Sequence, residues 1–98
     1  MYARVLSFFL GAEAEPATGQ VVEQVLPTIR ELDGYRGLVV LSELDGRRVV
    51  SLSLWETADA MERSREVTEK IRVAETANRD IESGDPSTFR VVAFDVTR

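Results

Sequence analysis

The sequence predicts an α+β fold whose elements follow the order strand, helix, strand, strand, helix, strand. Apolar residues alternate at period two in residues 2–10, in both halves of 37–55 and in 89–97, which is typical of strands. They recur at spacings of three and four in residues 18–34 and 57–81, which is typical of amphipathic helices. With right-handed crossovers, this order favours the ferredoxin-like βαββαβ arrangement: an antiparallel four-stranded sheet of order 4-1-3-2 with both helices on one face.

Composition limits the classes of site that the chain can build. Its 98 residues, 44% hydrophobic and 30% charged, are typical of one globular domain covering residues 1–98. The chain has no His and no Cys, so the commonest ligands of zinc and haem iron are missing. We therefore expect a protein without a metal or another cofactor.

Charge and hydropathy limit the partners in the same way. The net charge of −5 argues against nucleic acid, because affinity for phosphates depends on Lys and Arg. No apolar run approaches the roughly 20 residues that span a membrane, and no signal peptide is recognised at the start. We expect a cytoplasmic protein that binds neither nucleic acid nor a membrane.

Residues 37–55 are expected to form a hairpin around Asp45 and Gly46, a pair typical of type I′ turns, in which both central residues have positive φ. With Asp45 and Gly46 at the centre of the turn, Glu43 lies opposite Arg48, and the side chains of the two strands divide between two faces. One face is aliphatic and carries Val39, Leu41, Val50, Leu52 and Leu54. The other mixes apolar residues with hydroxyls and carries Leu38, Val40, Ser42, Val49, Ser51, Ser53 and Trp55. Because both faces are apolar, each needs a cover.

The two helices can cover only one of these faces. The remaining face is expected to pack against the same face of a second copy about a two-fold axis, so that two sheets enclose a barrel-like core. We predict a homodimer with the aliphatic residues of the hairpin at its centre. A domain of this size gains from such contact, because alone it buries only about 60–70% of its unfolded surface.

The other elements also contain residues that mark where they begin and end. The first helix is expected from about Thr18, as a cap, to Gly34, with a bend at Pro27. The second is expected from Thr57, and at about 25 residues it exceeds the length that the sheet needs, so we predict a break near residues 65–68. Residues 11–19 and 82–88 are loops by composition, and 89–97 is the last strand.

Four segments together resemble the antibiotic biosynthesis monooxygenase family over nearly the whole chain. They are the opening Met-Tyr-Ala-Arg, the stretch Val-Leu-Pro-Thr-Ile-Arg-Glu-Leu-Asp-Gly-Tyr-Arg-Gly at 25–37, the Asp-Gly-Arg turn, and Leu-Trp-Glu-Thr-Ala-Asp-Ala-Met-Glu-Arg-Ser at 54–64. The resemblance implies a dimeric α+β barrel. In active members it also implies the oxidation of polycyclic phenols to quinones without metal or flavin. The superfamily also holds haem-degrading proteins, which rely on a His absent here, and members with no known reaction.

The resemblance also implies where a ligand would bind. Trp55 matches the family's Trp at the end of the third strand, which in active relatives lines a cavity between sheet and helices. The candidate substrate-binding residues are Trp55, Ser51, Ser53, Ser42, Met61, Arg4 and Ser7, where Arg4 and Ser7 are alternatives because the register of the first strand is open. Where relatives are expected to have polar catalytic side chains, this chain has Ser51, Met61 and Arg65, so no catalytic residue is assigned.

Two functions follow from these residues. The first is a cofactor-independent monooxygenase acting on a planar aromatic or phenolic molecule. The second is a non-catalytic dimeric module that binds a small hydrophobic ligand. A large aromatic at a strand end is also a common core residue, so Trp55 alone does not choose between them.

Overall fold

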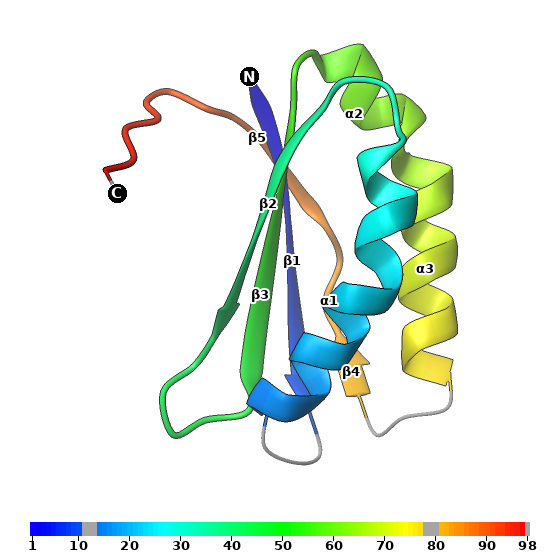
Figure 1. The fold of residues 1–98 in the computed structure, drawn as a ribbon, viewed down its shortest axis with the longest axis vertical. Coiled ribbons are helices and arrows are strands. Elements are labelled where there is room, and N and C mark those ends of the chain that lie inside the picture. Colours follow the sequence, from blue (N-terminus) through cyan, green and yellow to red (C-terminus); the bar gives the residue numbers. More distant parts are fainter. Residues whose placement is uncertain (11–13, 78–80, 98) are drawn as a thin grey trace.

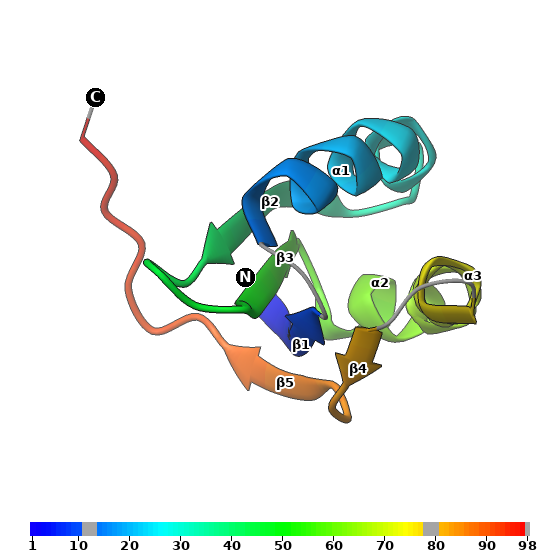
Figure 2. The ribbon, with the colours of Figure 1, turned by 90° about the horizontal axis from the view of Figure 1, so that it is seen from below.

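The computed structural model describes residues 1–10, 14–77 and 81–97, and the side chains of 1–10, 19–74 and 82–97. Its elements are β1 (Tyr2–Leu10), α1 (Ala14–Arg30), β2 (Tyr35–Ser42), β3 (Arg48–Trp55), α2 (Ala58–Arg63), α3 (Arg65–Ala77), β4 (Ile81–Ser83) and β5 (Ser87–Arg90). The sheet has the order β2-β3-β1, and β4 and β5 both pair with the other edge of β1. All helices lie on one side of this sheet (Figure 1; Figure 2), which confirms the ferredoxin-like prediction.

The hairpin has the predicted register but a different turn. Its pairs include Val39–Leu52, Leu41–Val50 and Ser42–Val49. Glu43 and Arg48 form the expected ion pair at 3.2 Å. The prediction of a type I′ turn is wrong, because positive φ falls on Asp45 (55°) and not on Gly46, whose N–H donates to the Glu43 carbonyl at 3.3 Å. A Cβ on Gly46 would lie 2.0 Å from Glu43 Oε1, so a larger residue there would have to displace the Glu43 side chain.

The helices differ from expectation mainly at their ends. α1 begins at Ala14, so the predicted cap Thr18 lies inside the helix and part of the predicted loop 11–19 is helical. α1 also continues through Pro27, where the bend stays a prediction. Thr57 caps α2 as predicted, with its Oγ1 accepting from Ala60 N at 3.0 Å. The predicted break is confirmed at Ser64, between α2 and α3.

The end of the chain departs further from the prediction. Residues 82–88 are not all loop, because β4 pairs with the end of β1 and β5 with its start. Regular structure stops at Arg90, which pairs with Tyr2, although a continuous strand over 89–97 was predicted. The physical reason is that β5 has reached Tyr2, the first residue of β1, at this point. The bond from Val91 N to Met1 O at 2.9 Å continues the contact, and residues 91–97 are in no regular structure. Residues 91–97 extend away from the rest of the chain (Figure 1).

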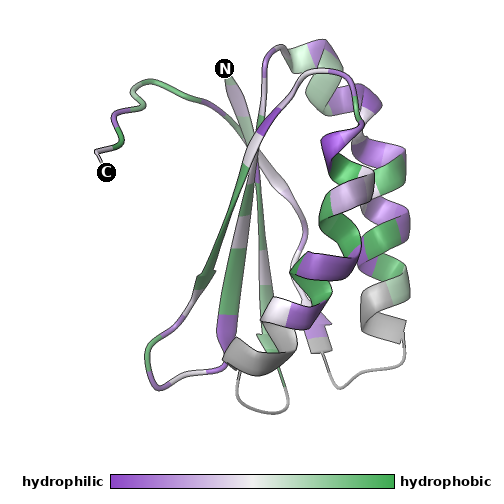
Figure 3. Ribbon diagram, in the orientation of Figure 1, coloured by the Kyte–Doolittle hydropathy of each residue, from purple (hydrophilic) through white to green (hydrophobic). Residues whose placement is uncertain are grey.

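The core is concentrated at one end of the two layers. Most fully buried residues lie where β1 begins, β3 ends and α2 crosses: Ala3, Arg4, Ile29, Leu54, Trp55, Ala60, Met61 and Ser64. Toward the hairpin turn, Val49 is buried, but most other helix-side residues are only partly buried, among them Leu6, Phe8, Leu38, Val40 and Ser51. Hydrophobic residues run along the strands and recur along α1 and α3 (Figure 3). The sheet and helices are therefore packed most tightly around Trp55 and less tightly away from it.

No helix within the described part of the chain is long and apolar enough to cross a membrane.

Candidate ligand-binding site

The pairing of β1 with β3 decides which face of the sheet the helices cover. Arg4 lies opposite Ser53, and Leu6 lies opposite Ser51. Arg4 reaches α2 and α3 with its side chain, so the hydroxyl-bearing face is the helix side. Ser7 pairs with Val50 and therefore lies on the other face. Its expected place in a site between sheet and helices is not supported, because a strand turns successive side chains to opposite faces.

Trp55 ends β3 in the centre of the core, with an exposed fraction of 0%. Its indole packs with Ile29 and Met61, and Tyr35 meets it edge to face with ring centroids 6.0 Å apart. Its only polar atom, Nε1, donates to Ser53 Oγ at 3.0 Å. The indole is thus a core residue, and Ser53, which is partly exposed, is the reachable group beside it.

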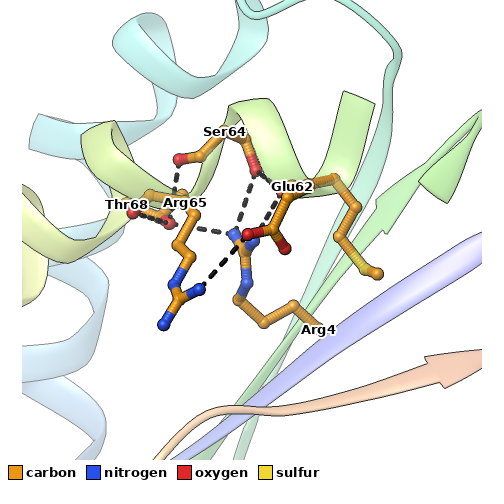
Figure 4. Close-up of polar contacts among 6 residues, drawn as sticks. Arg4, Glu62, Ser64, Arg65 and Thr68 are labelled. Atoms are coloured by element: carbon orange, nitrogen blue, oxygen red, sulfur yellow. Dashed lines mark hydrogen bonds and ion pairs between the residues drawn. The ribbon is translucent and has the colours of Figure 1, made fainter. Parts of the chain in front are cut away.

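Arg4 is a buried cation held by the helices (Figure 4). Its Nη2 donates to Met61 O at 2.5 Å, and its Nη1 donates to Ser64 Oγ at 3.0 Å and to Thr68 Oγ1 at 2.9 Å. These acceptors surround the break between α2 and α3, and none of them is a carboxylate. Burial lowers the pKa of Arg4, because desolvation disfavours the charged form, while the nearby charge of Glu62 opposes this shift.

The remaining candidates lie at different distances from this centre. Met61 is buried against Trp55 with its side chain and accepts from Arg4 with its carbonyl. Ser51 is partly buried on the same face, one pair further toward the turn. Ser42 is exposed at the far end of β2. The structure therefore brings Arg4, Ser53, Trp55 and Met61 together, with Ser51 as a neighbour and Ser42 apart.

Two of the three acceptors of Arg4, Ser64 and Thr68, were not singled out from the sequence. Ser64 was visible as a hydroxyl inside the apolar stripe of the second helix, and it is buried, with an exposed fraction of 3%. A buried hydroxyl needs a partner, and so does a charged residue on an apolar strand face. These two signals together make Arg4 and Ser64 candidates for a contact, but the contact also requires the register of β1, which the sequence left open.

Arg4 is the only charged residue among the paired positions that face the helices from β1, β2 and β3. The others are Tyr2, Leu6, Phe8, Leu10, Tyr35, Leu38, Val40, Ser42, Val49, Ser51, Ser53 and Trp55. In the described residues, no group of three or more acidic side chains could hold a metal ion. Such a face can hold a largely apolar molecule and offer hydrogen bonds to an oxygen atom, but it supplies no carboxylate as a base.

The opposite face carries the residues expected at a dimer interface. Val39 and Leu41 are 43% and 55% exposed, and Val50 and Leu52 are partly exposed. Leu54 is buried at 5% within its own chain, so it has little surface to offer. On the same side, Phe9 and Phe89 are half exposed and enlarge the apolar surface.

Two curated proteins are similar to this chain in sequence. Two uncharacterized proteins from two strains of Mycobacterium tuberculosis, MT2634 and Rv2557, are each 33% identical to this chain over 73 residues. The match covers 74% of this chain and 33% of those proteins, so the chain spans about one third of the length of these curated relatives.

Solved structures show the same fold at low sequence identity. SnoaB, a cofactor-independent oxygenase from Streptomyces nogalater, matches with a TM-score of 0.74 and 18% identity, over 95% of this chain and 94% of that chain. The haem degrader MhuD from Mycobacterium tuberculosis matches with a TM-score of 0.75 and 19% identity, over 99% and 100%. A monooxygenase from the gene ActVA-Orf6 of Streptomyces coelicolor, in complex with nanaomycin D, matches with a TM-score of 0.64 and 18% identity, over 97% and 92%.

The sequence profile described as antibiotic biosynthesis monooxygenase matches residues 1–74, from β1 into α3. This range contains the whole hairpin, Trp55, and the three acceptors of Arg4. The chain belongs to the antibiotic biosynthesis monooxygenase family and has the protomer fold of the dimeric α+β barrel proteins.

Proposed function

We propose that this protein is a cofactor-independent monooxygenase that acts on a planar phenolic molecule between the hydroxyl-bearing face of the sheet and the helices. The observation that carries the proposal is the grouping of Arg4, Ser53 and Trp55 on a face that is otherwise neutral and mostly apolar. Membership of the family supports an oxygenase reaction. SnoaB and the ActVA-Orf6 protein, described as an oxygenase and a monooxygenase, support it as well.

In this reaction the electron-rich ring itself reduces oxygen. A hydroxyanthracene loses two hydrogen atoms and gains one oxygen atom to become a quinone, and the second oxygen atom of O₂ leaves as water. The protein's part is to exclude water and to stabilise the negative charge of the phenolate. The buried positive charge of Arg4 and the hydroxyls of Ser51 and Ser53 are the groups suited to this task.

A haem does not fit the residues present. Haem iron is most often held by His or by a Cys thiolate, and the chain contains neither. The sulfur-bearing side chain of Met61 is packed against Trp55 and Ile29 in the core. No step through haem is therefore proposed, although the haem degrader MhuD shares the fold.

We also propose that the protein is a homodimer joined through the sheet face opposite the helices. Val39, Leu41, Phe9 and Phe89 leave a large apolar surface there in the single chain. The segment 91–97 adds further exposed apolar side chains: Val92, Phe94 and Val96. Apolar surface of this extent is typical of an interaction site, and a second copy meeting it about a two-fold axis covers both copies at once.

The test of the oxygenase is oxygen uptake by purified protein with 1-hydroxyanthracene. The expected result is one O₂ consumed for each quinone formed, at a rate proportional to protein concentration. Ser53→Val should slow the reaction, while Ser87→Ala, on the opposite side of the sheet, is the matched control. A rate no greater than that of the compound in buffer alone would rule out this activity.

The alternative is a non-catalytic dimeric module that binds a small hydrophobic ligand. The lack of a carboxylate at the paired helix-side positions favours it, because no acidic side chain there can take a proton from a phenol. Trp55 is the only tryptophan, so quenching of its fluorescence reports binding directly. Saturable quenching without oxygen uptake would establish this alternative.

A further inference from the structure

The bond between Trp55 and Ser53 has a direction that constrains any ligand. The indole N–H can only donate, so Ser53 Oγ is the acceptor in this contact, at 3.0 Å. A serine hydroxyl also carries one proton of its own. Within the described residues, that proton has no acceptor in hydrogen-bond range, since the bond from Trp55 is the only hydrogen bond of the Ser53 side chain.

Ser53 is also the exposed member of its group. Trp55 and Arg4 are buried, with exposed fractions of 0% and 7%, whereas Ser53 between them is partly exposed on the helix side. Arg4 lies directly opposite Ser53 in the β1–β3 ladder. Of these three groups, the hydroxyl of Ser53 is therefore the most accessible to a molecule that binds between sheet and helices.

Both neighbours favour donation by this hydroxyl to an oxygen that carries negative charge. A hydroxyl that already accepts a hydrogen bond becomes a better donor, because bonds in a chain polarise one another. The buried charge of Arg4 has no carboxylate among its bonded partners, and it attracts a negative oxygen across a medium of low dielectric constant. Two of the five guanidinium N–H groups are not used by the three bonds to the helices.

We propose that Ser53 donates a hydrogen bond to the ligand's oxygen, and that Trp55 acts through Ser53 as a positioning residue. This inference rests on the proposed function, in which the site binds an aromatic molecule. It assigns the ligand class as a ring system with a phenolate or ketone oxygen at the end that faces Arg4. It also assigns Trp55 a role other than stacking on the ligand, because its ring is enclosed by Ile29, Met61 and Tyr35.

The test compares 2-naphthol with naphthalene, which has the same rings and no oxygen. In calorimetry, we expect 2-naphthol to bind the wild-type protein at least about tenfold more tightly than naphthalene does. One charge-assisted hydrogen bond supplies a difference of this size. Ser53→Val should remove this preference. Ser53→Thr should retain the preference, because Thr has the same shape as Val and keeps the hydroxyl. Both β-branched residues suit a strand. If only Ser53→Val loses the preference for 2-naphthol, the loss is therefore not a folding effect.

A second measurement reports on Trp55 without relying on affinity. Because Trp55 is the only tryptophan, its indole N–H gives a single indole cross-peak in a ¹H–¹⁵N spectrum. This peak should move in Ser53→Val, stay near its position in Ser53→Thr, and shift saturably when 2-naphthol is added to the wild type. Trp55→Phe, which keeps an aromatic ring without the N–H, should weaken the preference for 2-naphthol while binding of naphthalene changes less.

The outcomes separate this inference from the proposed function. If both probes bind with equal affinity, the site stands and the role of Ser53 is overturned. If neither probe binds, the ligand site itself fails and the role of Ser53 fails with it. If Ser53→Val keeps the full preference for 2-naphthol, the donor is another group and the inference is wrong.

Discussion

Replacing Arg4 by Met should destabilise the protein while keeping most of the volume of the side chain. The change removes three hydrogen bonds from the guanidinium to Met61 O, Ser64 Oγ and Thr68 Oγ1. Bonds from a charged donor are worth about 1.5–3 kcal/mol each when a buried acceptor loses its partner. Two effects make the total loss of stability smaller than the sum of these three bonds. The Met61 carbonyl keeps the bond that Ser64 Oγ donates at 2.6 Å, and the cost of burying a charge is relieved.

We therefore expect the Arg4→Met substitution to lower the free energy of unfolding by about 2–4 kcal/mol. With a slope of about 1.5 kcal/mol per molar urea for a small domain, the midpoint of urea unfolding falls by roughly 1–3 M. Fluorescence of Trp55, which is fully buried, reports the transition. The protein concentration is held fixed, because dimerisation would couple to unfolding.

Arg65→Met is the matched control. Arg65 also pairs with an acceptor near the break, Glu62 at 3.2 Å, but the two side chains are 74% and 66% exposed. Exposed pairs of this kind are worth about 0–1 kcal/mol, so the midpoint should hardly move. Arg4→Lys, which keeps the charge without the planar fork, should fall between the two. If Arg4→Met were as stable as the wild type, the guanidinium would not be tying β1 to the helices, and our account of the α2–α3 junction would be wrong.

Two further predictions concern the packing of the chain and its assembly. Gly34→Ala should lower the free energy of unfolding, measured with urea, by about 1–2 kcal/mol or more. The reason is that φ is 77° at this position and the new Cβ would lie 2.4 Å from Ala60 Cβ. Unchanged stability would show that α2 can move away. Leu41→Asp should convert the proposed dimer into a monomer in sedimentation velocity, since Leu41 lies on the proposed interface. An identical sedimentation coefficient for the variant and the wild type would contradict this interface.

The hairpin shows why its register was predictable although its turn was not. Pairing depends on where the centre of the hairpin lies, and both the predicted and the observed turns are centred so that Val39 meets Leu52. The turn type depends on which residue takes positive φ. Asp45 takes it here, with the Glu43 carboxylate lying over Gly46. Side-chain placement of this kind is not encoded in a pattern of period two.

The last strand shows a different limit. Alternation in 89–97 correctly marks residues that can be extended, but a strand also needs an edge with free backbone groups. β5 reaches the first residue of β1 at Arg90, and the chain continues past that end. The free edge of β1 is shared between β4 and β5, and how they share it decides how far β5 can pair. This depends on the tertiary structure and cannot be inferred from the alternation in 89–97. The exposed apolar side chains of 91–97 are consistent with the proposed second copy.

At the site, the sequence placed Ser53 and Trp55 on one face and left Arg4 and Ser7 as alternatives beside them, and it did not show how these residues are connected. The missing element is the helix break at Ser64. A helix leaves its last carbonyls without intrahelical partners and favours a cation at that end. By ending α2 above β1, the break presents Met61 O to Arg4, and this fixes a buried positive charge opposite Ser53. The helix junction and the buried charge beside the proposed ligand site therefore depend on the same contacts. A change at Ser64 should alter both stability and ligand preference.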